Sequence, residues 1–143
     1  MKKKLLPCLL AMDAFLPVWE ETAKEMAGDY GLVRINAKIC RAKYEVGALN
    51  TQTGATSAED AYSEFLTCKT GVTKQAKAIY TRLLPRLKTP DAKRDLKDFQ
   101  VALMTSIETG EPRDGELKIQ YQQRHSAMDA RIEDAWQRLQ LNF

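Results

Sequence analysis

Histidine is almost absent from this chain, and its scarcity limits the chemistry that the chain can perform. The 143 residues include one histidine, three cysteines and seven glycines. A serine or cysteine nucleophile needs a neighbouring base, and His125 is the only imidazole. The cysteines lack the paired spacing of a zinc site, and the scattered glycines form no phosphate-binding loop. We therefore expect no catalytic centre, no metal and no cofactor.

A strong charge of one sign and long apolar runs are also missing. The formal net charge is only +3, and acidic residues are interspersed among the basic ones. Binding to DNA or RNA usually needs a dense basic face, so we expect no nucleic-acid partner. No apolar run reaches the roughly 20 residues that span a bilayer, so we expect no transmembrane span. The 44% hydrophobic and 29% charged residues are typical of a folded domain, and the length predicts one.

Apolar residues recur at helical spacing along most of the chain, and no alternating strand pattern is longer than four residues. Pro17 starts a first predicted helix, which should end near Gly28. A second helix is predicted where apolar positions step alternately by three and four residues. We expect these positions to form its inward face: Leu32, Ile35, Ile39, Ala42, Val46 and Leu49.

Three further helices are marked by terminal signals. Ser57 to Asp60 form a capping box, and Pro85 should kink or end the helix that follows. Thr89 before Pro90 predicts the next N-terminus, and Asp114 is expected to cap the last helix. The predicted fold is therefore all-α, an up-and-down bundle of four to five amphipathic helices. The inward stripes predicted for these helices are Ala61, Phe65, Cys68, Val72, Ala76, Ile79 and Leu83; Ala92, Leu96, Phe99, Leu103 and Ile107; and Leu117, Tyr121, His125, Met128, Ile132, Trp136 and Leu139.

The N-terminus has the outline of a secretory signal. Three lysines, Lys2 to Lys4, precede a mostly apolar run from Leu5 to Val18. Asp13 interrupts this run, and no small-x-small cleavage site follows it. We interpret residues 1–18 as a signal-peptide-like leader, with an N-terminal helix of the fold as the alternative. Residues 19–143 then form a single α-helical domain.

Cys40 and Cys68 lie at similar distances from the loop between their helices. In an antiparallel hairpin both would stand roughly 14 Å from the turn, facing each other. We predict one inter-helix disulfide, worth roughly 3 to 4 kcal/mol for a loop of about 28 residues. Such a bond persists in an oxidising compartment, which favours a periplasmic or secreted protein. The alternative is a cytoplasmic protein in which both thiols are reduced and buried.

Two residue sets are candidates for binding. His125 on an inward stripe is a candidate haem ligand in a four-helix bundle, although such a histidine is more often a hydrogen-bonded core residue. The region with the largest charge bias, together with nearby aromatic residues, is a candidate surface for an acidic or envelope-associated partner protein. Its residues are Lys69, Lys74, Lys77, Arg82 and Arg86, with Tyr80 and Trp136.

These observations favour a function by binding. The interpretation is a small exported, non-enzymatic helical protein that binds a partner protein in the bacterial envelope, as an inhibitor, immunity or accessory protein would. The alternatives are a cytosolic helical adaptor with reduced cysteines and, third, a haem-binding bundle that uses His125.

Overall fold

The computed structural model describes residues 16–143, which form four helices and no strand. They are α1 (Leu16–Gln52), α2 (Ala58–Leu83), α3 (Pro90–Glu108) and α4 (Lys118–Gln140), with a 3₁₀ turn at Leu84–Arg86. The prediction of an all-α bundle is confirmed. The predicted leader, residues 1–18, lies outside the described residues except for its last three, which begin α1. None of the helices in this described part is long and apolar enough to cross a membrane.

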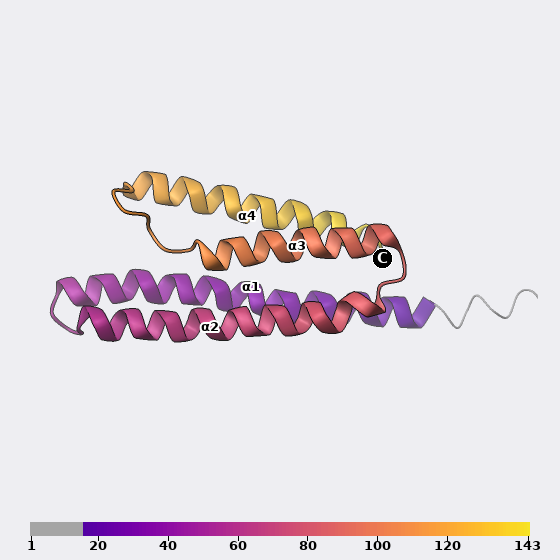
Figure 1. Ribbon diagram of the computed structural model, residues 1–143, viewed down its shortest axis with the longest axis horizontal. Helices are drawn as coiled ribbons and strands as arrows, with labels where there is room; N and C mark the ends of the chain where they lie inside the picture. The colour runs from indigo at the N-terminus through magenta and orange to yellow at the C-terminus, as the bar shows by residue number, and fades with distance from the viewer. Residues whose placement is uncertain (1–15) are drawn as a thin grey trace, which may run out of the picture.

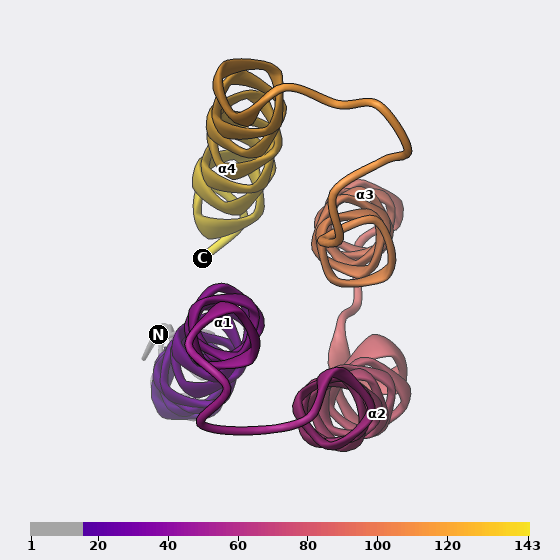
Figure 2. The ribbon, with the colours of Figure 1, turned by 90° about the vertical axis from the view of Figure 1, so that its left-hand side faces the viewer.

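The helices form two antiparallel hairpins that pack on each other. In Figure 1, α1 and α2 form one hairpin and α3 and α4 the other, and both hairpin turns lie at the same end of the molecule. The end-on view in Figure 2 shows the helices at four corners, in the order α1, α2, α3, α4. This is the up-and-down topology that short loops favour.

The first helix corrects two predictions. α1 is continuous through Gly28, so the expected break between two separate helices is wrong. A glycine costs only about 1 kcal/mol in a helix, and the core contacts of the flanking Met26, Tyr30 and Val33 outweigh it. The predicted inward face of residues 32–49 is also wrong, because its large aliphatic residues are exposed.

The termini of α2 and α3 are formed as predicted. The Ser57 side chain accepts a hydrogen bond from the Asp60 N–H at 3.0 Å, and α2 ends at Leu83, just before Pro85. The Thr89 side chain accepts from the Ala92 N–H at 3.1 Å and caps α3. Each cap satisfies an N–H group that the helix leaves unpaired.

The start of α4 differs from the prediction. Asp114 does not cap this helix, which begins at Lys118. Gly115 has φ of +73°, a left-handed conformation that a right-handed helix starting at Asp114 could not contain. The Leu117 N–H instead donates to the Gln120 side-chain oxygen at 3.0 Å.

An aromatic cluster from α1, α3 and α4 forms the centre of the core. Tyr30 packs edge-on against Phe99, with ring centroids 4.8 Å apart, and Phe99 lies 5.0 Å from Trp136. The Tyr30 hydroxyl donates to Gln100 Oε1 at 3.0 Å. Burial raises the pKa of Tyr30, so this hydroxyl remains a hydrogen-bond donor.

The predicted disulfide is present and joins the helices of the first hairpin. Cys40 of α1 and Cys68 of α2 are bonded, with Cα atoms 5.6 Å apart. Cys40 is only 4% exposed. The bond therefore holds α1 in the rotation that buries Cys40 against α2 and leaves its neighbour Ile39 47% exposed.

Candidate functional site: a basic cleft between the hairpins

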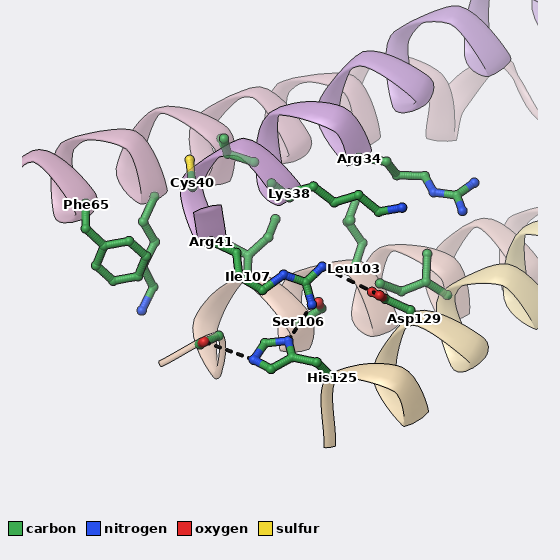
Figure 3. Close-up of a pocket in the computed structure, with 15 residues that line it drawn as sticks. Arg34, Lys38, Cys40, Arg41, Phe65, Leu103, Ser106, Ile107, His125 and Asp129 are labelled. Atoms are coloured by element: carbon green, nitrogen blue, oxygen red, sulfur yellow. Dashed lines mark hydrogen bonds and ion pairs between the residues drawn. The ribbon is translucent and has the colours of Figure 1, made fainter. Parts of the chain in front are cut away.

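A small cleft opens between the two hairpins, near the end where their turns lie. Its volume is about 60 Å³. Its lining combines apolar residues, which we call its floor, with charged residues from α1, α2 and α4 (Figure 3). The floor includes Ala37, Cys40, Phe65, Val72, Leu103, Ile107 and Ile132, and the charged residues are Arg34, Lys38, Arg41, Lys69 and Asp129.

Two arginines of α1 reach across to α4. Arg41 donates through Nη1 to His125 Nδ1 at 2.7 Å, and its Nη2 lies 3.5 Å from Asp129 Oδ2 (Figure 3). About two helical turns away, Arg34 donates to Glu133 Oε2 at 2.7 Å, which lowers the pKa of Glu133. The two acidic partners are about half exposed, at 43% and 49%. The arginines therefore lie between an apolar floor and solvent.

His125 has a defined tautomer in this site. Because an arginine can only donate, Nδ1 accepts the bond from Arg41, and Nε2–H donates to the Gly110 carbonyl oxygen at 3.0 Å. Burial and then the Arg41 charge lower the pKa of His125, so the ring is neutral near pH 7. Both ring nitrogens are thus engaged within the protein, and a haem iron would have to displace one of these bonds.

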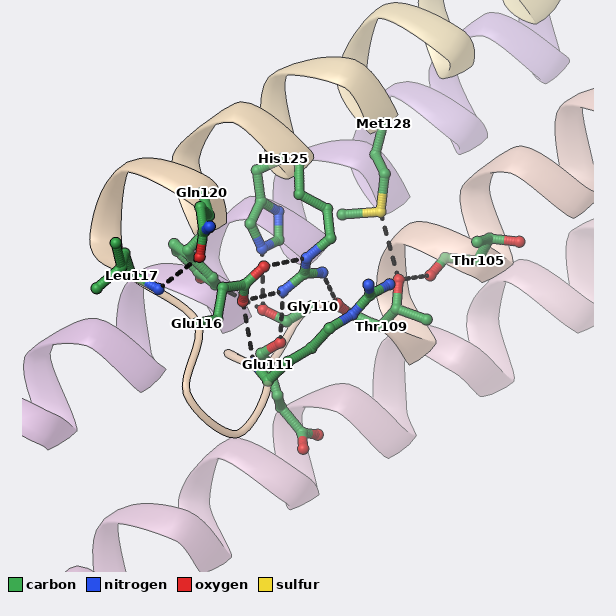
Figure 4. Close-up of polar contacts among 12 residues, drawn as sticks. Thr105, Thr109, Gly110, Glu111, Glu116, Leu117, Gln120, His125 and Met128 are labelled. Atoms are coloured by element: carbon green, nitrogen blue, oxygen red, sulfur yellow. Dashed lines mark hydrogen bonds and ion pairs between the residues drawn. The ribbon is translucent and has the colours of Figure 1, made fainter.

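The loop that carries Gly110 is held by Arg124. This guanidinium forms a bidentate pair with Glu116, with both N···O distances 2.7 Å, and donates to the carbonyls of Thr109 and Glu111. Figure 4 shows the network around Glu116, Gly110 and Glu111. The Arg124 hydrogen bonds lower the pKa of Glu116 to about 2. The loop is therefore an ordered wall of the cleft, which positions Gly110 for His125.

Lys69 brings a further positive charge from α2. Its Nζ lies 2.7 Å from Glu111 Oε1, donates to the Glu108 carbonyl at 3.0 Å, and lies 5.8 Å from the Phe65 ring centroid. Lys69 belongs to the basic set predicted from the sequence, and the structure places it at the cleft.

The other members of the predicted basic and aromatic set lie elsewhere. Lys74 and Lys77 are exposed on α2 and line no part of the cleft. Arg82 forms ion pairs with Asp29 and Glu25 of α1, and Arg86 forms one with Glu25. Tyr80 is partly buried against the core, and Trp136 lies in it, 8% exposed.

Sequence reasoning did not identify Arg34, Arg41, Asp129 or Arg124 as site residues. One available signal was the spacing of Arg34, Lys38 and Arg41, which places three cations on one side of a helix. The partners on α4 depend on the packing of distant segments, so no local pattern indicates them.

Among residues 16–143, no group of three or more His, Cys, Asp or Glu side chains is placed to hold a metal ion.

Comparisons with protein-family models, curated proteins and solved structures found no match to this chain. Inferences about function therefore rest on the geometry of the cleft, of the disulfide and of the exposed surfaces.

Proposed function

We propose that the protein acts by binding a partner protein, and that the cleft receives an acidic side chain of that partner. The observation that carries the proposal is the convergence of Arg34, Arg41 and Lys69 around an apolar floor. Arginine binds carboxylates through two parallel hydrogen bonds, and a partly desolvated site strengthens such pairs.

The size of the cleft supports a side chain as the ligand. Pockets for small molecules and cofactors measure roughly 300 to 1,000 Å³. At about 60 Å³, this cleft has room for a group the size of a carboxylate with its methylene stem. The rest of the partner would then lie across the surface around the cleft mouth, as in a protein–protein interface.

The present ion pairs allow an exchange of carboxylates. The Arg41 Nη2 to Asp129 distance of 3.5 Å is longer than the roughly 2.7 to 2.9 Å of a strong charged hydrogen bond. Asp129 is 43% exposed, so it can move into solvent at little cost. An incoming carboxylate would replace it on Arg41 and gain contact with the apolar floor.

The proposed compartment is the periplasm or the extracellular space. The Cys40–Cys68 bond is the support for it, because structural disulfides persist where thiols are not kept reduced. An inhibitor, immunity or accessory protein of the bacterial envelope would combine both features, the disulfide and the cleft for an acidic side chain.

The intact mass of the protein from its native host tests the compartment. Loss of the leader together with two hydrogens would support export, and a full-length chain with three alkylatable thiols would support a cytosolic adaptor.

A matched pair of variants tests the cleft. Fluorescence anisotropy with labelled Asp- and Glu-rich peptides would measure binding to the wild type, to Arg41→Gln/Lys69→Gln and to Lys74→Gln/Lys77→Gln. Each double variant removes two positive charges, but only the first removes them from the cleft. We expect the first to weaken binding about tenfold or more and the second to change it less than about threefold.

The controls separate the site from general charge. Both variants should melt within a few degrees of the wild type, which shows that the fold is intact. Equal weakening by the two variants would mean that the peptides bind the whole basic surface of α2 and that the cleft has no special role. No binding of any acidic peptide would refute the cleft as the acidic docking site.

A further inference from the structure

The face of α1 that points away from the core is apolar. Five large aliphatic residues on it are between 47% and 61% exposed, and Ala42 is exposed among them. This stripe, which we call the outer stripe, spans about 26 Å along the helix. Monomeric proteins rarely leave a continuous apolar patch of this kind in water. The five residues are Leu32, Ile35, Ile39, Val46 and Leu49.

The outer stripe has the pattern of a coiled-coil seam. Its residues alternate steps of three and four, which is the heptad spacing of two paired helices. The pattern is also symmetric about its midpoint, between Cys40 and Arg41. If a second α1 lies antiparallel across a two-fold axis there, every apolar residue meets another: Leu32 with Leu49, Ile35 with Val46, and Ile39 with Ala42.

The surface beside the outer stripe is concave. A groove of about 450 Å³ lies between α1 and α2, with Ile39, Ala42 and Val46 on one side and Ala61 and Glu64 on the other. Small side chains at the seam allow helix backbones to approach closely. The shape therefore suits a helix that packs lengthwise on α1.

Charges flanking the outer stripe select the orientation of that helix. Lys38 and Glu45 are both exposed and occupy the same flank, one heptad apart. In the antiparallel arrangement, Lys38 of each copy faces Glu45 of the other, which forms two attractive pairs. A parallel arrangement would instead place Lys38 opposite Lys43, a repulsive pair.

We propose that the outer stripe is a homodimer interface, in which α1 of a second copy packs antiparallel on α1. This proposal goes beyond the proposed function, because it uses the face of α1 opposite the core and not the arginines of the cleft; Lys38 borders both sites. The resulting dimer would present two clefts related by a two-fold axis.

Sedimentation equilibrium of the oxidised full chain tests the assembly. A Cys8→Ser background prevents an intermolecular disulfide from imitating the dimer. We expect a mass of twice 16.2 kDa at high concentration. Ile35→Glu should give a monomer, whereas Val101→Glu should remain dimeric, because Val101 is equally exposed at 57% but lies on α3.

Charge reversal tests the orientation. Lys38→Glu or Glu45→Lys alone should raise the dimer dissociation constant about tenfold, since two pairs change from attraction to repulsion. The double variant Lys38→Glu/Glu45→Lys should restore the wild-type value. Three results would each overturn the proposal: a monomeric wild type, a dimer that survives Ile35→Glu, or a double variant that dimerises no more tightly than the single variants. A monomeric wild type that still binds acidic peptides would leave the proposed function intact.

Discussion

Replacing both Cys40 and Cys68 with alanine should lower the melting temperature by about 14 °C. The bond closes a loop of 28 residues, for which the chain-entropy relation gives about 3.5 kcal/mol of stabilisation. For a chain of this length, 1 kcal/mol corresponds to a shift of about 4 °C. Besides the loop of residues 53–57, this disulfide is the covalent link between α1 and α2 in the described part of the chain.

Calorimetry on three samples isolates the contribution of the bond. The samples are the oxidised wild type, the wild type reduced while unfolded and then refolded with reductant, and the double alanine variant. The oxidised wild type should melt highest, and the other two should melt close together. The difference between the reduced wild type and the alanine variant measures only the packing of the sulfur atoms, of which Cys40 is the more deeply buried.

One result would refute this reasoning. If the oxidised and the reduced wild type melt at the same temperature while the alanine variant melts lower, then packing of the sulfur atoms supplies the stability and the bond does not. The disulfide would then lose its weight as support for an oxidising compartment.

Three further predictions concern single side chains. The pKa of His125 is lowered below 6.5 in the folded protein, so the free energy of unfolding should decrease as the pH drops below 6.5. His125→Gln should make the melting temperature less dependent on pH between pH 7 and 5. An unchanged pH dependence of the melting temperature would contradict this prediction. Glu116, whose pKa is lowered to about 2, should lose its contribution to the free energy of unfolding as the pH falls from 4.5 to 2. At pH 7, Glu116→Gln should speed amide hydrogen exchange in the α3–α4 loop and leave the core helices protected. Tyr30→Phe leaves the buried Gln100 oxygen without its donor and should lower the free energy of unfolding in urea by about 1 to 3 kcal/mol. The control Tyr62→Phe, at an exposed position, should change it by almost nothing. Equal losses of stability in the two variants would show that the hydrogen bond is not responsible.

Local signals in the sequence predicted the caps of α2 and α3 and the inward face of α3. The caps at Ser57 and Thr89 need only residues within one turn, so they form wherever a helix follows. The inward stripe of α3 is buried as predicted, because this helix has a single apolar face and therefore only one way to pack. Pro85 ended α2 for the equally local reason that it has no N–H to donate.

The cleft could not be predicted in the same way. Arg41 and His125 are 84 residues apart, and Arg34 and Glu133 are 99 apart. Each pair exists only because the two hairpins pack with α1 beside α4. The ordered α3–α4 loop was hidden for a similar reason: Arg124 looks like one more surface cation until the loop folds back onto it.

The error on α1 had a remedy within the sequence itself. Residues 39 and 40 point about 100° apart on a helix, so Ile39 and Cys40 cannot both face the centre of a bundle. The two predictions, a Cys40–Cys68 bond and an inward Ile39, therefore excluded each other. The bond is the better guide, because a disulfide constrains helix rotation more strictly than an apolar pattern does. Once Cys40 faces α2, the most aliphatic stripe of α1 has to face outward. An apolar stripe forced outward by a disulfide is the feature that a second copy of the chain would cover, because exposure of such a surface favours association.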